Sequence, residues 1–361
     1  MSVSALPKAY AVNQTVTYPA ILGPGALSGR ARGAKPLETN SLDPGAGKPQ
    51  PISPARLEAA RIEQFRSEEQ AQTDQQTEGD ARRLFALEQL EVSWEAETGA
   101  LWAFMRPRGR PSYNSALLDD IHALQRGVVA SFRGEPDGLR YLVAGSRTPG
   151  VFSLGGDLDH FATCIRKGDR QALVDYGRSC VRVLHGFYTA LDLPIVTIGV
   201  AQGDALGGGL ESLLSFNVII AERGAKFGFP EALFGLFPGM GAYSLVARRI
   251  GAALAEDMML SGRSYSAEEM KDMGLVHILA EPGQGIAAAR DYMERNKRRH
   301  AGIRGVFEAG RVVHPLAMAE LDRIVEIWSD ACLHLTDRDL KIMQRLVSAQ
   351  DRLAPTLQAA E

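Results

Sequence analysis

Residues 201–241 read AQGDALGGGLESLLSFNVIIAERGAKFGFPEALFGLFPGMG, and the fold can be argued outward from this stretch. Three consecutive glycines at 207–209 separate an apolar run, 195–201, from a segment with helical spacing. Residues 216–220 are rich in β-branched side chains, which favour a strand. The stretch therefore predicts strand, glycine-rich turn, helix, strand, turn and helix, an alternation that indicates an α/β protein.

Two glutamates lie at the predicted helix starts, Glu211 after the glycines and Glu231 after Pro230. Backbone amides at a helix N-terminus have no partner inside the helix, and with the helix dipole they stabilise an oxygen that gains negative charge. A carboxylate nearby can move a proton at the adjacent carbon atom. The pattern therefore suits a thioester whose enolate is held by backbone amides while glutamates transfer protons.

The same residues also fit a structural turn in which both glutamates are ordinary charges in the first turn of a helix. Short motifs of this kind have many false matches. The neighbours favour chemistry, because Glu211 comes just before two leucines and Glu231 lies between Phe-Pro and Ala-Leu-Phe. Apolar surroundings raise the pKa of a carboxylic acid, which suits proton transfer.

Four motifs occur in an order and spacing that resemble the crotonase (enoyl-CoA hydratase/isomerase) superfamily. They are FSLGGDL at 152–158, ALGGGLES at 205–212, FGFPEALFGLFPGMGAYSLVARRIG at 227–251 and LSGRSYSAEEMKDMGLVHILA at 260–280. AQGDALGGG, PEALFGLFPGMGAYS and the later EIW at 326–328 are closer still to the bacterial diffusible signal factor (DSF) synthases. These are crotonase-fold enzymes that make cis-2-unsaturated fatty acid signals. The resemblance covers roughly residues 85–352.

The fold that this resemblance implies is α/β, a crotonase-like spiral of ββα units with a C-terminal helical region. The predicted organisation is a flexible Pro/Gly-rich and polar extension at 1–80, a crotonase-like core at 81–284 and the helical region at 285–361. The extension is argued from composition, since residues 1–54 carry eight of the 18 prolines and show neither a helical nor a strand period. It lies outside the resemblance.

The resemblance also transfers site roles residue by residue. It implies catalytic roles for Glu211 and Glu231 and an oxyanion hole made by the amides of Gly156 and Gly208, with Gly155 in place of Gly156 if the register differs by one. The residues that it implies for substrate binding are Leu154, Trp328 and Leu346. A tryptophan on a helix is more often a simple core residue, so both interpretations of Trp328 stay open.

The activity that the resemblance implies is that of a dehydratase which is also a thioesterase. A 3-hydroxyacyl thioester on acyl carrier protein would lose water, and hydrolysis would release the free cis-2-unsaturated acid for quorum sensing. Which glutamate acts as acid and which as base is left open. The resemblance further implies a sensor histidine kinase as partner and a homo-oligomer, a trimer or a multiple of trimers.

Two other functions remain open at this point. The first is an ordinary enoyl-CoA hydratase that acts on CoA thioesters with the same two glutamates and releases no acid. The second is a crotonase-fold binding partner of a signalling kinase with little catalysis of its own. The presence of both glutamates and both glycine segments argues against the second.

Composition argues against several further classes of protein. A net charge of −3 leaves no electrostatic footprint for nucleic acid, and no apolar run approaches the ~18 residues that a membrane helix needs. The N-terminus lacks a charged segment followed by an apolar core, so we expect no signal peptide and a cytoplasmic protein. The cysteines, Cys164, Cys180 and Cys332, show no metal or disulfide spacing, so we expect no metal. Gly239-Met240-Gly241 lacks the third spaced glycine of a dinucleotide-binding fingerprint, and we expect no cofactor.

Overall fold

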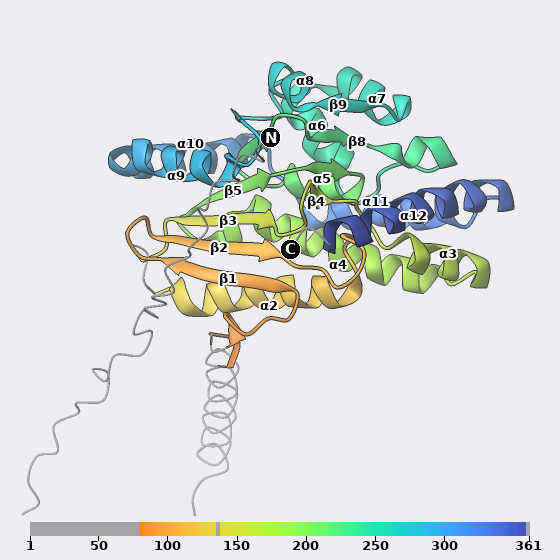
Figure 1. Ribbon diagram of the computed structural model, residues 1–361, viewed down its shortest axis with the longest axis horizontal. Coiled ribbons are helices and arrows are strands. Elements are labelled where there is room, and N and C mark those ends of the chain that lie inside the picture. Colours follow the sequence, from red (N-terminus) through yellow and green to blue (C-terminus); the bar gives the residue numbers. More distant parts are fainter. Residues whose placement is uncertain (1–78, 82, 135–137, 359–361) are drawn as a thin grey trace, which may run out of the picture. The chain divides into compact units, whose positions relative to one another are not determined.

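The computed structural model describes residues 79–81, 83–134 and 138–358, with 349–358 described by their backbone alone. The predicted extension at 1–80 lies outside the described residues except for Gly79 and Asp80, so its boundary stays a prediction. The described residues from Asp80 onward belong to one compact unit. Two sheets and the helices that cover them build this unit (Figure 1).

The larger sheet has six strands, of which the first two form an antiparallel hairpin while the others pair in parallel. In spatial order they are β1 (Leu90–Glu95), β2 (Ala100–Met105), β3 (Tyr141–Ser146), β5 (Val196–Ala201), β7 (Val218–Glu222) and β10 (Ile278–Ala280). Strands β3 and β5 are buried at every position, as expected for parallel strands that are covered on both faces. The strand predicted from the apolar run at 195–201 is confirmed.

Helices cover both faces of this sheet. Because successive side chains of a strand alternate between faces, Leu101 and Leu142 join the main core with α2 (Ser115–Phe132) and α4 (Arg170–Tyr188). Trp102 and Val143 point the other way, toward α9 (Gly285–Asn296) and α10 (His300–Val313). In Figure 1, α2 lies on one side of the sheet while α9 and α10 lie on the other.

The smaller sheet explains the ββα repeat. Its strands, in spatial order, are β4 (Val151–Ser153), β6 (Asp204–Leu206), β8 (Lys226–Gly228) and β9 (Ser264–Ser266), with only the last antiparallel to its neighbour. Strands β3, β5 and β7 of the large sheet are each followed by one strand of this sheet and then by a helical segment. These segments are α3 (Leu158–Lys167), α5 (Gly208–Leu213) and the 3-10 turn η2 (Pro230–Phe234). The predicted crotonase-like spiral of ββα units is therefore confirmed.

The remaining helices differ from the sequence prediction at three places. Residues 171–191 have a spacing that predicts one long helix, but that helix ends at Tyr188, and residues 190–192 form a turn, η1, in which three non-glycine residues have positive φ. Within the C-terminal region the sequence predicts helices at about 285–299, 316–334 and 337–352, and the structure adds a separate helix, α10, after the 3-10 turn η3 (Lys297–Arg299). The segment at Glu231 is a single 3-10 turn rather than a helix, because Gly235 at φ +78° ends it.

Other elements agree with expectation. The sequence Ser-Ala-Glu-Glu at 266–269 is typical of a capping box, and Ser266 and Glu269 do bond reciprocally at the start of α8. The helical C-terminal region is confirmed as well. The helices that complete the fold are α6 (Ala242–Ile250), α7 (Ala252–Ser261), α8 (Ala267–Asp272), α11 (Met318–Cys332) and α12 (Asp337–Gln358).

Candidate active site

Two glycine turns meet where neighbouring strands of the smaller sheet end. Strands β4 and β6 pair in parallel, so the turn at 155–156 and the glycine run at 207–209 leave the same edge of the sheet. A Cβ atom built on Gly155 would lie 2.9 Å from the carbonyl oxygen of Leu206 and 3.0 Å from the amide nitrogen of Gly208. With φ at +96°, Gly155 also has a backbone conformation that side chains rarely adopt. Glycine is therefore required for the two turns to touch.

The amides of Gly156 and Gly208 come together at this contact. A Cβ atom on Gly208 would lie 3.4 Å from the amide nitrogen of Gly156. Gly208 is the first residue of α5, where an amide has no carbonyl partner within the helix. Within the described part of the chain, no backbone hydrogen bond from the Gly156 amide occurs either. Two adjacent amides with free donors can stabilise an oxygen that becomes negatively charged.

Glu211 lies one turn into α5 and is 2% exposed. Its Oε1 atom accepts hydrogen bonds from the amides of Met240 (2.8 Å) and Ala242 (2.9 Å), at the loop that begins α6. Burial raises the pKa of Glu211 to about 7, and the two amides act in the opposite direction. The side chain is thus held in one orientation while its proton remains exchangeable near neutral pH.

Glu231 is held differently. It lies in η2, directly after β8, which pairs with β6 beside the glycine run. A Cβ atom on Gly207 would lie 2.5 Å from Glu231 Oε1, and Oε2 is buried with no hydrogen-bond partner among the described residues. Burial raises the pKa of Glu231 to about 8, with a further contribution from the negative charge of Glu211. A buried carboxyl oxygen without a partner suits a group that meets substrate.

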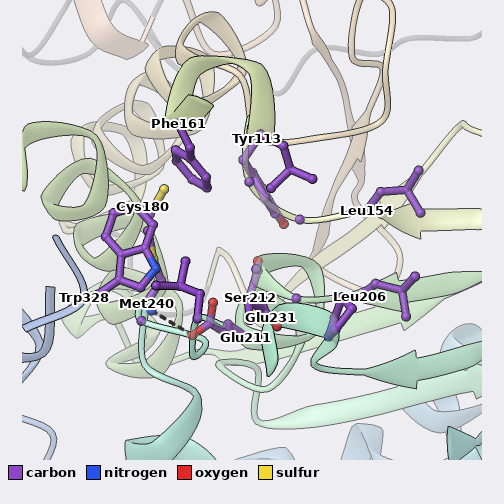
Figure 2. A pocket seen from close by; sticks show the side chains of 18 of the residues that line it. Tyr113, Leu154, Phe161, Cys180, Leu206, Glu211, Ser212, Glu231, Met240 and Trp328 are labelled. Atoms are coloured by element: carbon purple, nitrogen blue, oxygen red, sulfur yellow. Dashed lines mark hydrogen bonds between the residues drawn. The ribbon is translucent and has the colours of Figure 1, made fainter. Parts of the chain in front are cut away.

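One cavity of about 240 Å³ joins all of these groups. All eight residues to which the sequence assigns a role line it: Leu154, Gly155, Gly156, Gly208, Glu211, Glu231, Trp328 and Leu346. Figure 2 shows Glu211 and Glu231 on one wall, with Leu154 and Tyr113 across the space from them. The structure therefore brings the predicted residues together, and their chemical roles stay predictions.

The end of the cavity toward the C-terminal helices is apolar. The rings of Phe161, from α3, and Trp328, from α11, meet edge to face with centroids 5.0 Å apart. Leu346, from α12, lines the same cavity. Trp328 is only 2% exposed and packs against Gly239, where a Cβ atom would lie 2.3 Å from the indole Cγ. A hydrocarbon chain fits this surface, because burial of apolar area is favourable.

The sequence did not point to several polar residues that also line the cavity. They are Tyr113, Tyr176, Cys180 and Ser212. Ser212 follows Glu211 directly, and that adjacency is a signal that could have found it. Tyr113 gives no such signal, because it reaches the cavity through an isolated bridge to Gly156. Burial raises the pKa of Tyr113 above its usual value. A hydrogen bond with Ser212 acts in the opposite direction but is the smaller effect.

The comparisons with known proteins agree with this geometry. The family described as enoyl-CoA hydratase/isomerase matches residues 105–298, and the chain belongs to this family. An enoyl-CoA isomerase/hydratase of Zymoseptoria tritici is 28% identical over 254 residues, which are 69% of this chain and 76% of that protein. The family match therefore spans both glycine turns and both glutamates.

Solved structures extend the likeness. DspI of Pseudomonas aeruginosa is 25% identical, with a TM-score of 0.54 over 66% of this chain and 95% of that one. An enoyl-CoA hydratase of Bacillus halodurans has a TM-score of 0.58 at 20% identity, over 72% of this chain and all of that one, and this likeness shows the fold alone. Among the described residues, no three His, Cys, Asp or Glu side chains lie close enough together to hold a metal ion. No described helix has the length and hydropathy of a membrane span.

Proposed function

We propose that this protein is a diffusible signal factor synthase that dehydrates a 3-hydroxyacyl thioester and then hydrolyses it. The observation that carries the proposal is the pair of glutamates with raised pKa values, which share one largely apolar cavity with the amides of Gly156 and Gly208. The motif resemblance of residues 201–209, 230–244 and 326–328 to the signal synthases supports the product class. Membership of the hydratase family supports the first step.

The first step is a β-elimination. The carbonyl oxygen of the thioester accepts hydrogen bonds from the Gly156 and Gly208 amides, which stabilise the enolate. One glutamate removes a proton from C2, and the other gives a proton to the 3-hydroxyl group, which leaves as water. One proton is taken up and one is released, so the pair ends with its starting charge. The two carboxyl groups interact, so their protons belong to the pair.

The second step uses the same oxyanion hole. A glutamate in its carboxylate form removes a proton from a water molecule, which attacks the thioester carbonyl. The tetrahedral intermediate places its negative charge on the oxygen already held by the two amides. When it collapses, the carbon–sulfur bond breaks, the thiol of the carrier leaves with the proton, and the free 2-enoic acid remains. One site can serve both steps, since both develop charge at the same atom.

The experiment that tests this function measures the released acid. Purified protein is incubated with a 3-hydroxyacyl thioester of acyl carrier protein and, separately, with the same acyl group on CoA. Mass spectrometry of the free acids then identifies the product, and chromatography against cis and trans standards gives the geometry of its double bond. Enoyl thioester without free acid would show a hydratase that lacks the second step.

A second candidate is an ordinary enoyl-CoA hydratase. The name and the identity of the Zymoseptoria tritici relative favour it, since both glutamates would serve hydration of a 2-enoyl-CoA equally well. In that case the protein would interconvert 3-hydroxyacyl-CoA and 2-enoyl-CoA, and no acid would accumulate. The CoA arm of the same experiment separates the two functions.

Partners and assembly belong to the same proposal. We infer a cytoplasmic protein that forms a trimer or a multiple of trimers and that binds a sensor histidine kinase. Light scattering of the purified chain measures the oligomeric state. Co-purification with the kinase from the native host tests the binding of the kinase. A stable monomer, or a signal level that does not change when the kinase is deleted, would count against the respective inference.

A further inference from the structure

The hydroxyl group of Tyr176 joins two backbone segments beside the oxyanion hole. Tyr176 lies on α4 and is buried. Its Oη atom accepts a hydrogen bond from the amide of Asp157 (3.1 Å) and donates one to the carbonyl oxygen of Tyr113 (2.5 Å). Asp157 directly follows Gly156 in the chain.

The segment 111–113 is itself attached to the glycine turn by its backbone. The amide of Tyr113 donates to the carbonyl of Gly155 (2.8 Å), and the amide of Leu154 donates to the carbonyl of Pro111 (2.8 Å). Tyr113 and Gly156 form an isolated parallel bridge. A single hydroxyl group, on a helix that belongs to neither segment, therefore bonds to both segments at the end of this short ladder.

Packing around Tyr176 leaves the turn little freedom. The ring of Phe161 meets the ring of Tyr176 edge to face, with centroids 5.0 Å apart. A Cβ atom on Gly156 would lie 2.7 Å from Phe161 Cζ and 3.5 Å from Tyr176 Oη. Burial raises the pKa of Tyr176 well above its usual value, so the hydroxyl keeps its proton and remains a donor at working pH.

We propose that Tyr176 is a positioning residue, which fixes the direction of the Gly156 amide by holding Asp157 and Tyr113 through one hydroxyl group. The inference rests on the proposed function and deepens it. Without the hydroxyl, the half-buried amide of Asp157 and the buried carbonyl of Tyr113 each lose a hydrogen bond, and the turn moves to regain hydrogen bonds. An oxyanion-hole donor acts only when it points at the developing charge, so both chemical steps slow together.

Tyr176→Phe tests the inference, with Tyr188→Phe as the matched control. Tyr188 lies on the same helix and also donates to a backbone carbonyl, that of His314 (2.6 Å), but it does not line the cavity. Both variants lose one hydroxyl group and one hydrogen bond to a carbonyl. Circular dichroism and thermal melting first establish that each is folded.

Kinetics give the first readout. Hydration of crotonyl-CoA and conversion of a 3-hydroxyacyl thioester of carrier protein are measured for the parent and both variants. We expect Tyr176→Phe to lower kcat by about tenfold to a hundredfold in both reactions, as for a displaced catalytic group, with KM changed by less than about threefold because the apolar contacts persist. Tyr188→Phe keeps the parent kcat. A Tyr176→Phe variant with parent kcat overturns the inference.

Hydrogen exchange gives a second readout that needs no turnover. Peptides that cover 153–161 should exchange faster in Tyr176→Phe than in the parent and Tyr188→Phe, and unchanged exchange overturns the inference. If Tyr176→Phe does not fold, the exchange rate of the Asp157 amide in the parent protein tests the inference instead. Rapid exchange of this amide is incompatible with its hydrogen bond to Tyr176 and overturns the inference. A parent that converts no thioester refutes the proposed function, and the exchange measurement still tests the positioning of the turn.

Discussion

The carboxyl group of Glu231 occupies the space that a side chain on Gly207 would fill, with Oε1 2.5 Å from the position of a Cβ atom there. Gly207 also has φ +53° and ψ −126°, a combination that glycine tolerates and other residues rarely adopt. The first residue of the glycine run therefore has two constraints, one from its own backbone and one from the carboxyl group that it faces.

Substitution of Gly207 should separate these constraints. We expect Gly207→Ala to lose at least about a hundredfold in kcat, because the methyl group displaces Glu231 from its place. Strain adds a destabilisation on the order of 1–3 kcal/mol. The measurement is hydration of a 2-enoyl-CoA together with urea denaturation.

Gly224→Ala is the matched control for that variant. Gly224 has φ +92°, but a Cβ atom there meets nothing within 4 Å, and the residue does not line the cavity. It should show the strain in its stability and keep the parent kcat. Parent activity in Gly207→Ala would mean that Glu231 can work from a different position.

Each glutamate can be tested by an amide replacement that keeps its shape. We expect Glu211→Gln and Glu231→Gln each to lower kcat for dehydration and for acid release by about 10²–10⁴-fold, the usual contribution of general acid–base catalysis. Gln cannot exchange the proton, although it still accepts hydrogen bonds. If either variant keeps the parent rate in both reactions, that glutamate has no catalytic role.

The chain offers a control for this pair in Glu222. That residue is 5% exposed and accepts hydrogen bonds from the amides of Gly283 (2.7 Å) and Gly285 (2.8 Å), much as Glu211 does from Met240 and Ala242. It does not line the cavity. Glu222→Gln should therefore keep the parent kcat, and a loss there comparable with Glu211→Gln would point to a structural cause in both.

The sequence could predict those parts of the site that depend on short motifs and on their order along the chain. The glycine runs identify close backbone approach, and the motif order places both glutamates beside them. Tyr176 could not be found in this way, because its two hydrogen-bond partners lie 19 and 63 residues away along the chain. The pairing of β4 with β6 that brings Gly155 to Gly208 likewise depends on tertiary structure.

Two errors in the fold have physical reasons. The helix expected at Glu231 is one 3-10 turn, since Pro230 begins it and Gly235 in the left-handed region ends it within a few residues. The helix at 300–313 was not predicted because it carries three glycines, at 302, 305 and 310, which lower helix propensity, and none of its residues is buried.

The raised pKa values predict how stability depends on pH. Glu211 and Glu231 have pKa values of about 7 and about 8 in the folded protein, above the ordinary value of 4.5. The folded state therefore binds more protons than the unfolded state between these limits, and the free energy of unfolding falls as pH rises from about 4.5 to about 8. Above that window both states are ionised and the contribution is lost.

Urea denaturation at pH 5, 7 and 9 measures this dependence. The doubly substituted Glu211→Gln, Glu231→Gln protein should lose less stability across the window than the parent, by a difference on the order of a few kcal/mol, since one pKa unit corresponds to about 1.4 kcal/mol. Parallel pH profiles for the two proteins would contradict the raised pKa values.

The contact between Phe161 and Trp328 predicts where the length of the acyl chain is limited. The two rings meet edge to face at the apolar part of the cavity, so a smaller side chain at 328 lengthens the space available to a hydrocarbon tail. We expect Trp328→Leu to shift the ratio of kcat/KM toward longer 3-hydroxyacyl thioesters by about tenfold or more, since each methylene group in an apolar pocket contributes about 1–3 kcal/mol. The variant also leaves a cavity beside Gly239, which lowers its melting temperature.

Ile327→Ala, at the neighbouring position of α11 where the parent side chain is 49% exposed, should leave the preference for acyl chain length unchanged. A series of acyl chain lengths assayed against all three proteins decides the matter, and an unchanged ratio in Trp328→Leu would show that Trp328 is a core residue that does not limit the acyl chain.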